Sequence, residues 1–184
     1  MSWTLFPLDM KVQVMGVLPY AVAMTSKGSK RPAKPRWLSP DEMLTWRAVN
    51  LLLATLPGAL GSQLQRDSGL SFLEYYVLVL LSDQPDHTLR MSQLAFLANS
   101  ELSRLSHAIR RMEDRGLVRR EPDPMDGRFT HAILTDVGKA EVIKAAPGHV
   151  EQVRRLIFDV LDEKEQHVLR DALVKITSQL SSNC

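Results

Sequence analysis

A single cysteine, Cys184, occupies the last position of this 184-residue sequence. One thiol cannot form a disulfide within the chain, and it cannot supply the paired cysteines of a structural zinc site. Five histidines are present, and no two of them have the spacing of metal ligands on a helix: His87, His107, His131, His149 and His167. We therefore expect a protein of the reducing cytoplasm, with no disulfide framework and with no metal or other cofactor predicted.

The signatures of catalysis and of membrane insertion are also missing. The sequence has no glycine-rich phosphate loop and no recognisable pairing of a nucleophile with a base, so we do not expect an enzyme. No run of about 20 apolar residues is evident, so no membrane-spanning helix is expected. A composition of 45% hydrophobic and 24% charged residues, with a net charge of +2, is ordinary for one soluble domain.

Residues 1–37 differ in character from the rest of the chain. Residues 12–23 mimic the apolar part of a signal peptide, but Gln13 and Pro19 interrupt the run. We favour an appended strand or helix that packs on a dimer, or residues upstream of the start codon used in the cell. Residues 27–36 are basic and free of acids, which indicates a solvated linker or, alternatively, an arm that touches a DNA backbone.

Lysine is absent between Arg36 and Lys139, where ten arginines carry all the positive charge. Arginine makes bidentate contacts to phosphate and guanine that lysine cannot make. A GC-rich genome would produce the same bias without a functional cause, so this feature leaves both explanations open.

The strongest pattern lies in residues 91–138 and begins with two short helices joined by a tight turn. Ser92 is expected to cap the first helix. In the second helix the apolar residues recur at helical spacing and predict a buried face: Leu102, Leu105, Ile109 and Met112. The opposite face carries small or basic side chains: Ser100, Ser103, Arg104, His107, Arg110 and Arg111. Such a face suits base edges near its start and phosphates further along, although alone it would also fit a solvated helix.

A β-hairpin is predicted directly after this helix. Gly116 should end the helix in a left-handed conformation. Residues 117–121 and 129–134 read as two extended runs, and prolines with Asp126-Gly127 separate them. Arg128 then lies at the tip of the hairpin, where it can enter a narrow minor groove. Asp126 is close enough to pair with Arg128 and to fix its direction.

The order of these features resembles the MarR family of bacterial transcription regulators. That family carries D-x-R in its wing, followed by L-T-x-x-G, and the matching residues are Asp126, Arg128, Leu134, Thr135 and Gly138. The resemblance covers roughly residues 38–180. It implies a mainly α winged helix-turn-helix protein with a small β-hairpin wing, which dimerises through its N- and C-terminal helices. It also implies binding to a pseudopalindromic operator in double-stranded DNA and, often, release by a small ligand.

Helix signals outside this unit predict the frame that would hold it. Ser39 and Ser71 begin two capped helices, Thr135 begins a long one that bends near Pro147, and Asp162 begins a final one that ends near Leu180. We expect an N-terminal extension at 1–37 and a MarR-type domain at 38–184. Within that domain, the DNA-binding lobe is expected at about 70–135 and dimerisation helices at about 39–66 and 136–180.

An effector site and an alternative function complete the sequence-based hypotheses. Ligand-binding residues are expected where apolar area meets a polar group: Trp46, Tyr75, Tyr76 and His149. Each of these could equally be a core or interface residue. The leading function is a DNA-binding regulator, most simply a repressor. The alternative is a winged-helix module that binds an acidic protein partner instead of DNA.

Overall fold

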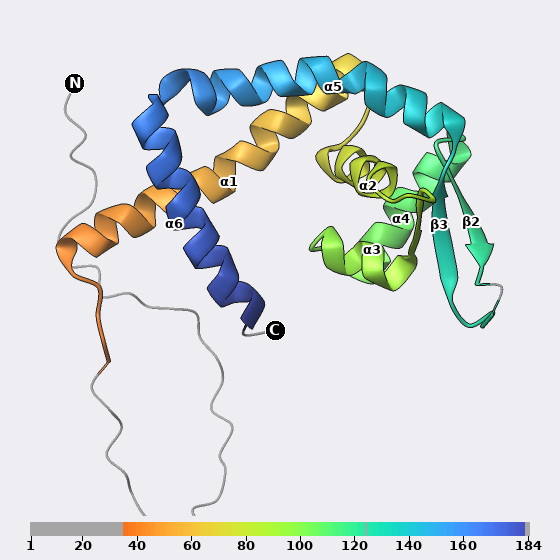
Figure 1. Ribbon diagram of the computed structural model, residues 1–184, viewed down its shortest axis with the longest axis horizontal. Helices are drawn as coiled ribbons and strands as arrows, with labels where there is room; N and C mark the ends of the chain where they lie inside the picture. The colour runs from red at the N-terminus through yellow and green to blue at the C-terminus, as the bar shows by residue number, and fades with distance from the viewer. Residues whose placement is uncertain (1–34, 124, 183–184) are drawn as a thin grey trace, which may run out of the picture. The chain divides into compact units, whose positions relative to one another are not determined.

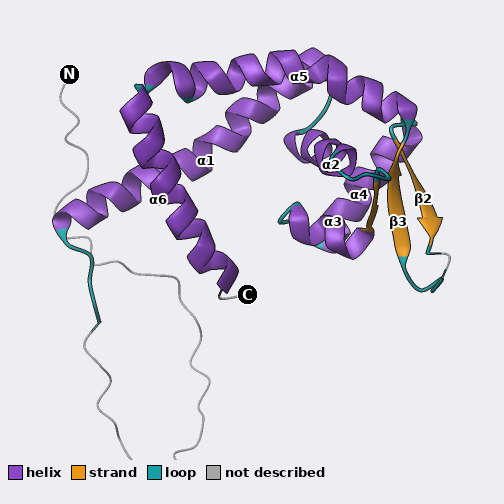
Figure 2. Cartoon of the chain, in the orientation of Figure 1, coloured by secondary structure: helices purple, strands orange, loops and turns teal. Residues whose placement is uncertain are grey.

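The computed structural model describes residues 35–123 and 125–182, and the chain divides into two units, Met1–Leu38 and Ser39–Cys184. The hypotheses on residues 12–23 therefore lie outside the described residues. The second unit contains six α-helices, one 3-10 helix and three strands among its described residues (Figures 1 and 2). Their bounds are α1 Pro40–Ser68, α2 Phe72–Ser82, β1 Thr88–Arg90, α3 Met91–Leu97, α4 Leu102–Asp114, β2 Val118–Pro122, β3 Thr130–Leu134, α5 Asp136–Leu156, η1 Phe158–Val160 and α6 Glu163–Ser182.

Local hydrogen bonds fix the helix starts that the sequence predicts. The Ser39 and Ser71 hydroxyls each accept the backbone N–H three residues on, and Glu42 and Glu74 accept the N–H of the serine in return. Asp162 and Glu165 form the same reciprocal pair at α6. These capping boxes satisfy donors that a helix end would otherwise leave open, which is why these boundaries were predictable.

Two local predictions about the helix-turn-helix are wrong. Helix α3 begins at Met91, one residue before the expected cap Ser92, and Arg90 precedes it in extended conformation with no side-chain cap. Leu102 is half exposed at the start of α4, and the buried face consists of Leu105, Ala108, Ile109 and Met112. The first turn of α4 projects beyond the core, so burial begins one turn later than the periodicity suggested.

A small antiparallel sheet follows α4, with the strand order β1-β3-β2. The hairpin β2–β3 confirms the predicted wing, and its register pairs Val118 with Leu134 and Pro122 with Thr130. Gly116 adopts φ 70°, as predicted for the residue that turns the chain out of the helix. Strand β1 adds a third strand that the sequence did not indicate, because three residues are too few for a readable alternation.

The core lies where the end of α1, α2, α4 and the hairpin meet. Helix α2 is its centre: Val77, Leu78 and Leu81 are fully buried, and burying each such side chain stabilises the fold by about 1.5–3 kcal/mol. Helix α5 packs across the C-terminal part of α1 (Figure 1). The Cβ of a residue at Gly148 would lie 3.2 Å from Gln63 Nε2, so the two helices approach closely there.

The outer helices leave much apolar surface uncovered in the single chain. Helix α1 buries only residues in its last third, and both α1 and α5 run through an internal proline, Pro57 and Pro147, without a break in the helix. The exposed large apolar side chains of α1 and α6 are Met43, Leu44, Trp46, Val49, Leu51, Leu52, Leu53, Val168, Leu173, Val174, Ile176 and Leu180. Exposed apolar area on this scale marks an interaction surface.

By length and composition alone, α1 is apolar enough to cross a membrane, which corrects the expectation that no helix would pass that test. The helix nevertheless carries Asp41, Glu42 and Arg47 near its start, and its last third joins the core described above. Only weak evidence for a membrane span follows from one helix of this kind.

Candidate nucleic-acid interface

Helix α4 presents one exposed polar face opposite its buried one. Ser103, Arg104, His107 and Arg110 are all exposed, and Ser100 is half-buried in the turn that precedes the helix. The side chains of Arg104 and His107 make no hydrogen bond or ion pair within the described residues, so they are available to a partner. The turn itself depends on Asn99, which adopts φ 45° and is a residue type that tolerates the left-handed region.

Five of the six predicted residues on this face border one hollow of about 810 Å³: Ser100, Ser103, Arg104, His107 and Arg111. Arg110 does not line it. The hollow also reaches Phe72 and Tyr76, whose rings stack at 6.3 Å between centroids. This surface combines hydroxyls, an imidazole and two guanidiniums. It can therefore donate several hydrogen bonds to an anionic or acceptor-rich ligand.

Arg111 has a structural partner that the sequence analysis missed. Its Nε donates to Glu74 Oε1 at 3.0 Å, and its Nη2 lies 3.0 Å from the same oxygen. Glu74 is buried and also closes the capping box of α2. Arg111 therefore joins α4 to α2, although its side chain stays more than half exposed.

The wing tip carries the predicted pair of Asp126 and Arg128. The guanidinium donates from Nε to Oδ1 at 2.9 Å and from Nη2 to Oδ2 at 2.7 Å, and the same carboxylate accepts the Arg128 backbone N–H at 3.1 Å. The side-chain hydrogen bond from Arg128 is the main reason that the pKa of Asp126 is lowered, and the pair raises the pKa of Arg128. The hydrogen bonds to Asp126 set the direction of the Arg128 guanidinium. The Arg128 side chain is 86% exposed, so it remains accessible to a partner.

Asp123 organises the base of the wing, and sequence reasoning missed it. Its buried carboxylate accepts the backbone N–H of Met125 at 2.8 Å and of Asp126 at 3.2 Å, and it also accepts Arg90 Nη2 at 2.6 Å. The Met125 N–H is the largest of the causes that lower the pKa of Asp123. An Asp followed by Pro in a loop is a typical turn residue, which is the signal that could have revealed this role.

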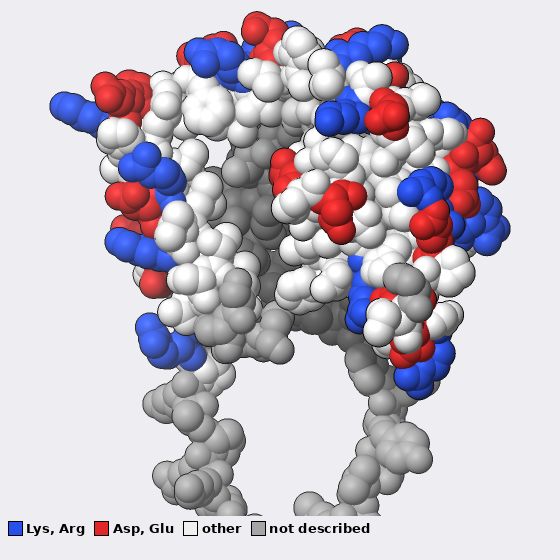
Figure 3. All heavy atoms as spheres, turned by 45° about the vertical axis from the view of Figure 1, so that its right-hand side comes forward, with Lys and Arg blue, Asp and Glu red and all other residues white. Residues whose placement is uncertain are grey.

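Arg90 and Arg120 tie the wing to the helices beside it. The Arg90 guanidinium lies 4.8 Å from the centroid of the Phe129 ring while it bonds Asp123. Arg120 donates from Nε and Nη2 to Glu113 at the end of α4, at 2.9 and 2.6 Å. That hydrogen bond is the main reason that the pKa of Glu113 is lowered. Figure 3 shows one face of the lobe, on which Lys and Arg side chains lie interspersed with Asp and Glu side chains.

The four residues expected to bind a ligand do not share one pocket in the described chain. Tyr75 contacts His149, with the ring centroids 4.6 Å apart, whereas Tyr76 lines the hollow beside α4. Trp46 is half exposed on the N-terminal part of α1. Burial raises the pKa of Tyr75 and lowers that of His149, and the buried Nδ1 of His149 finds no hydrogen-bond partner among the described residues.

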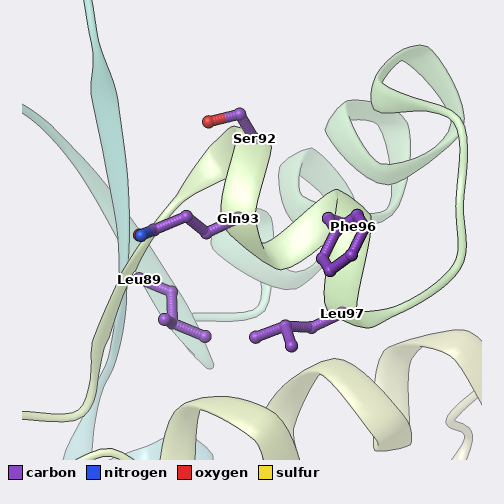
Figure 4. Close-up of a pocket in the computed structure, with 5 residues that line it drawn as sticks. All are labelled: Leu89, Ser92, Gln93, Phe96 and Leu97. Carbon is purple, nitrogen blue, oxygen red and sulfur yellow. The ribbon is translucent and has the colours of Figure 1, made fainter. Parts of the chain in front are cut away.

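A separate apolar hollow lies on the outer side of α3 (Figure 4). Leu89 and Leu97 line it, and the Phe96 ring stands beside them and is 78% exposed. Ser92 and Gln93 supply its few polar atoms. The described residues contain no group of three or more His, Cys, Asp or Glu side chains placed to hold a metal ion.

A family model and solved structures that are similar to this chain all point to one family. The sequence model of the MarR family matches residues 68–128, which span α2 to the wing tip. Two solved structures from Streptomyces coelicolor are similar. Sco3205, a MarR family transcriptional regulator in complex with DNA, is 42% identical with a TM-score of 0.76, over 80% of this chain and 92% of that one. AbsC, also a MarR family transcriptional regulator, is 38% identical with a TM-score of 0.73, over 80% and 99%.

A curated relative is more distant. The HTH-type transcriptional repressor YetL of Bacillus subtilis is 29% identical over 112 residues. The match spans 61% of this chain and 64%, just under two thirds, of the length of YetL. The similarity to Sco3205 and AbsC, by contrast, extends over nearly their whole lengths at well above 30% identity. With its helix-turn-helix and its three-stranded wing, this chain belongs to the MarR family of transcription regulators.

Proposed function

We propose that this protein is a cytoplasmic, sequence-specific DNA-binding regulator, acts as a repressor and has no enzymatic activity. The observation that carries the proposal is the combination of two elements: the exposed polar face of α4, on which Arg104 and His107 have no partner within the described residues, and the exposed Arg128, which Asp126 holds in one direction. Helix α4 enters the major groove, where Ser103, Arg104 and His107 meet base edges. Arg128 enters the adjacent minor groove, where the negative potential is concentrated.

The protein acts as a homodimer on a pseudopalindromic operator. Support comes from the exposed apolar side chains of α1 and α6, which a second copy of the chain would cover. Two copies present two α4 helices, and the half-sites are expected to lie one helical turn, about 10 bp, apart. Regulation by a small molecule fits the hollow of about 810 Å³ beside α4, since ligand pockets have about 300–1,000 Å³. A ligand on Tyr76 there would compete with DNA for Arg104 and His107.

The experiment selects bound duplexes from a random pool and footprints the protein on the DNA upstream of its own gene. A single consensus with two-fold symmetry and a protected site are expected, and sedimentation should give a dimer. Arg104→Ala is expected to relax specificity at one base position by about 1–3 kcal/mol. His107→Ala tests a second residue on the same face of α4. Unchanged affinity for both variants would contradict the assigned face. Capture of an acidic protein by this face, with no duplex selected from the pool, would favour a protein-binding module.

A further inference from the structure

A third hollow separates α4 from the wing, and basic and hydroxyl side chains line it. Its volume is about 260 Å³. Arg90, Arg120 and Arg128 border it, with the hydroxyl residues Ser92, Ser106 and Thr130 and an apolar floor that includes Leu102. Its lining contains no acidic residue. The hollow is therefore lined by three guanidinium donors from three different segments, β1, β2 and the wing loop, and the carboxylate paired with each of them lies outside the lining.

The acidic partners of these arginines hold the guanidiniums from outside the lining. Asp123 accepts from Arg90, Glu113 from Arg120 and Asp126 from Arg128. Each pairing leaves at least one N–H-bearing nitrogen of the guanidinium, such as Arg120 Nη1, without a hydrogen bond to the described residues. Side chains fixed before a ligand arrives lose less rotamer freedom on binding. The hydroxyl of Ser106 likewise makes no hydrogen bond within the described part of the chain.

The geometry points to a single occupant: we infer that this hollow binds one phosphodiester of the operator strand that runs between the two grooves. The inference rests on the proposed function. If α4 lies in the major groove and Arg128 in the neighbouring minor groove, the sugar–phosphate backbone that separates the grooves must pass between α4 and the wing. That strand meets Arg120 and Arg90, for which planar bidentate contacts to phosphate are favourable. Arg90, Arg120 and Ser106 thus become DNA-positioning residues outside the set read from the sequence.

The test combines a variant of the protein with a neutral phosphate. The probe is the duplex that the parent protein selects from a random pool, synthesised with a methylphosphonate at one backbone position in each half-site and scanned along the strand. Arg120→Gln is expected to lower affinity for the unmodified duplex by about tenfold for each half-site. The slope of log affinity against log salt should become shallower by about 0.9 for each half-site.

Coupling between the two changes identifies the phosphate. At one scanned position between the grooves, parent and Arg120→Gln should bind the modified duplex within twofold of each other, because the partner of Arg120 is gone. Arg119→Gln is the matched control, since Arg119 projects from the opposite face of β2 and pairs with Glu121. Its loss should be smaller and equal on modified and unmodified duplexes. Ser106→Ala, which leaves every described ion pair intact, should lose about threefold and only when that phosphate is charged.

Three results would overturn the inference. Equal losses for Arg120→Gln and Arg119→Gln would show that only net charge matters. A penalty for Arg120→Gln that persists at every methylphosphonate position would show that no single phosphate occupies the hollow. Failure of the parent to select any duplex would remove the proposed function itself, whereas selection of a duplex without coupling removes this inference alone. Thermal unfolding of each variant at one protein concentration separates loss of contact from loss of fold.

Discussion

Gly138 is the position where one added methyl group should do most damage to the fold. Its N–H donates to Thr135 Oγ1 at 3.0 Å in the first turn of α5. A Cβ at this position would lie 2.1 Å from the Leu117 carbonyl oxygen and 2.7 Å from Leu134 Cδ1. The leucine methyl can rotate away, but the carbonyl is fixed because it accepts hydrogen bonds from the Thr135 N–H and hydroxyl at 3.2 and 3.0 Å.

The magnitude follows from the displacement that Gly138→Ala requires. An ordinary contact begins at 3.4 Å, so α5 and the start of β2 must separate by about 1.3 Å. Overpacking of this kind costs about 1–3 kcal/mol. Weakening the two hydrogen bonds to Leu117 adds about 1 kcal/mol each, while the better helix propensity of alanine returns about 1 kcal/mol. We expect a loss of about 3 kcal/mol and a Tm lower by about 6–12 °C.

The assay is thermal unfolding of parent and variant at one fixed protein concentration, since association shifts the apparent stability of a dimer. Gly127→Ala is the matched control, because a Cβ at Gly127 meets no atom within 4 Å. Its free energy of unfolding should stay within about 0.5 kcal/mol of the parent value. If Gly138→Ala unfolds within 2 °C of the parent, within the smallest shift that about 1 kcal/mol produces, the argument from close packing of α5 on the hairpin fails.

Three further predictions concern the interface and its supports. Arg128→Ala should weaken binding to the selected operator by about tenfold or more without changing the Tm, and Asp126→Asn should lose less because the positive charge remains; equal binding by parent and Arg128→Ala at several salt concentrations would refute a wing in the groove. Arg111→Ala should lower the free energy of unfolding by about 1 kcal/mol, since Glu74 is buried but Arg111 is more than half exposed, and a double-mutant cycle with Glu74→Gln should show their coupling; additive losses would mean that the pair does not join α4 to α2. Burial lowers the pKa of His149, so below a pH of about 6.5 the unfolded chain binds a proton that the native state resists, and the free energy of unfolding should fall as the pH drops. In urea unfolding between pH 7.5 and 5.5, the free energy of unfolding of His149→Phe should depend less on pH than that of the parent. Parallel pH profiles for the two proteins would exclude His149 as the cause.

Sequence reasoning succeeded where structure depends on neighbours a few residues apart. The boxes at Ser39 and Ser71, the turn at Gly116 and the pair of Asp126 with Arg128 are all local, so their residue types and spacing sufficed. It failed where the partner is distant in sequence. Arg90 lies 33 residues from Asp123 and Arg111 lies 37 residues from Glu74, and no spacing rule connects them.

The same limit explains the errors in the helix-turn-helix. Leu102 has the spacing of a core residue, but the core does not extend to the first turn of α4. Its exposure therefore depends on the tertiary structure and not on the periodicity. Ser92 is a better capping residue than Arg90, yet β1 delivers the chain to α3 already extended at Arg90. Of the four candidate ligand residues, Tyr75 and His149 lie together whereas Tyr76 lines another hollow, because composition alone does not tell which face of α2 a tyrosine occupies.

The Arg115 side chain donates to the carbonyls of Gly69 and Ser68 at 3.0 and 3.4 Å, which fastens the end of α4 to the end of α1. Helix α1 has 29 residues and is therefore about 43 Å long. A tilt of about 5° at its N-terminal end displaces the far end by about 4 Å, which is close to the rise of one base pair, about 3.4 Å. Because Arg115 connects the end of α4 to the end of α1, α4 moves together with the C-terminal end of α1. In the proposed dimer, a change of a few degrees in the angle between the two α1 helices would therefore shift the spacing of the two α4 helices by about one base pair, out of register with half-sites one helical turn apart.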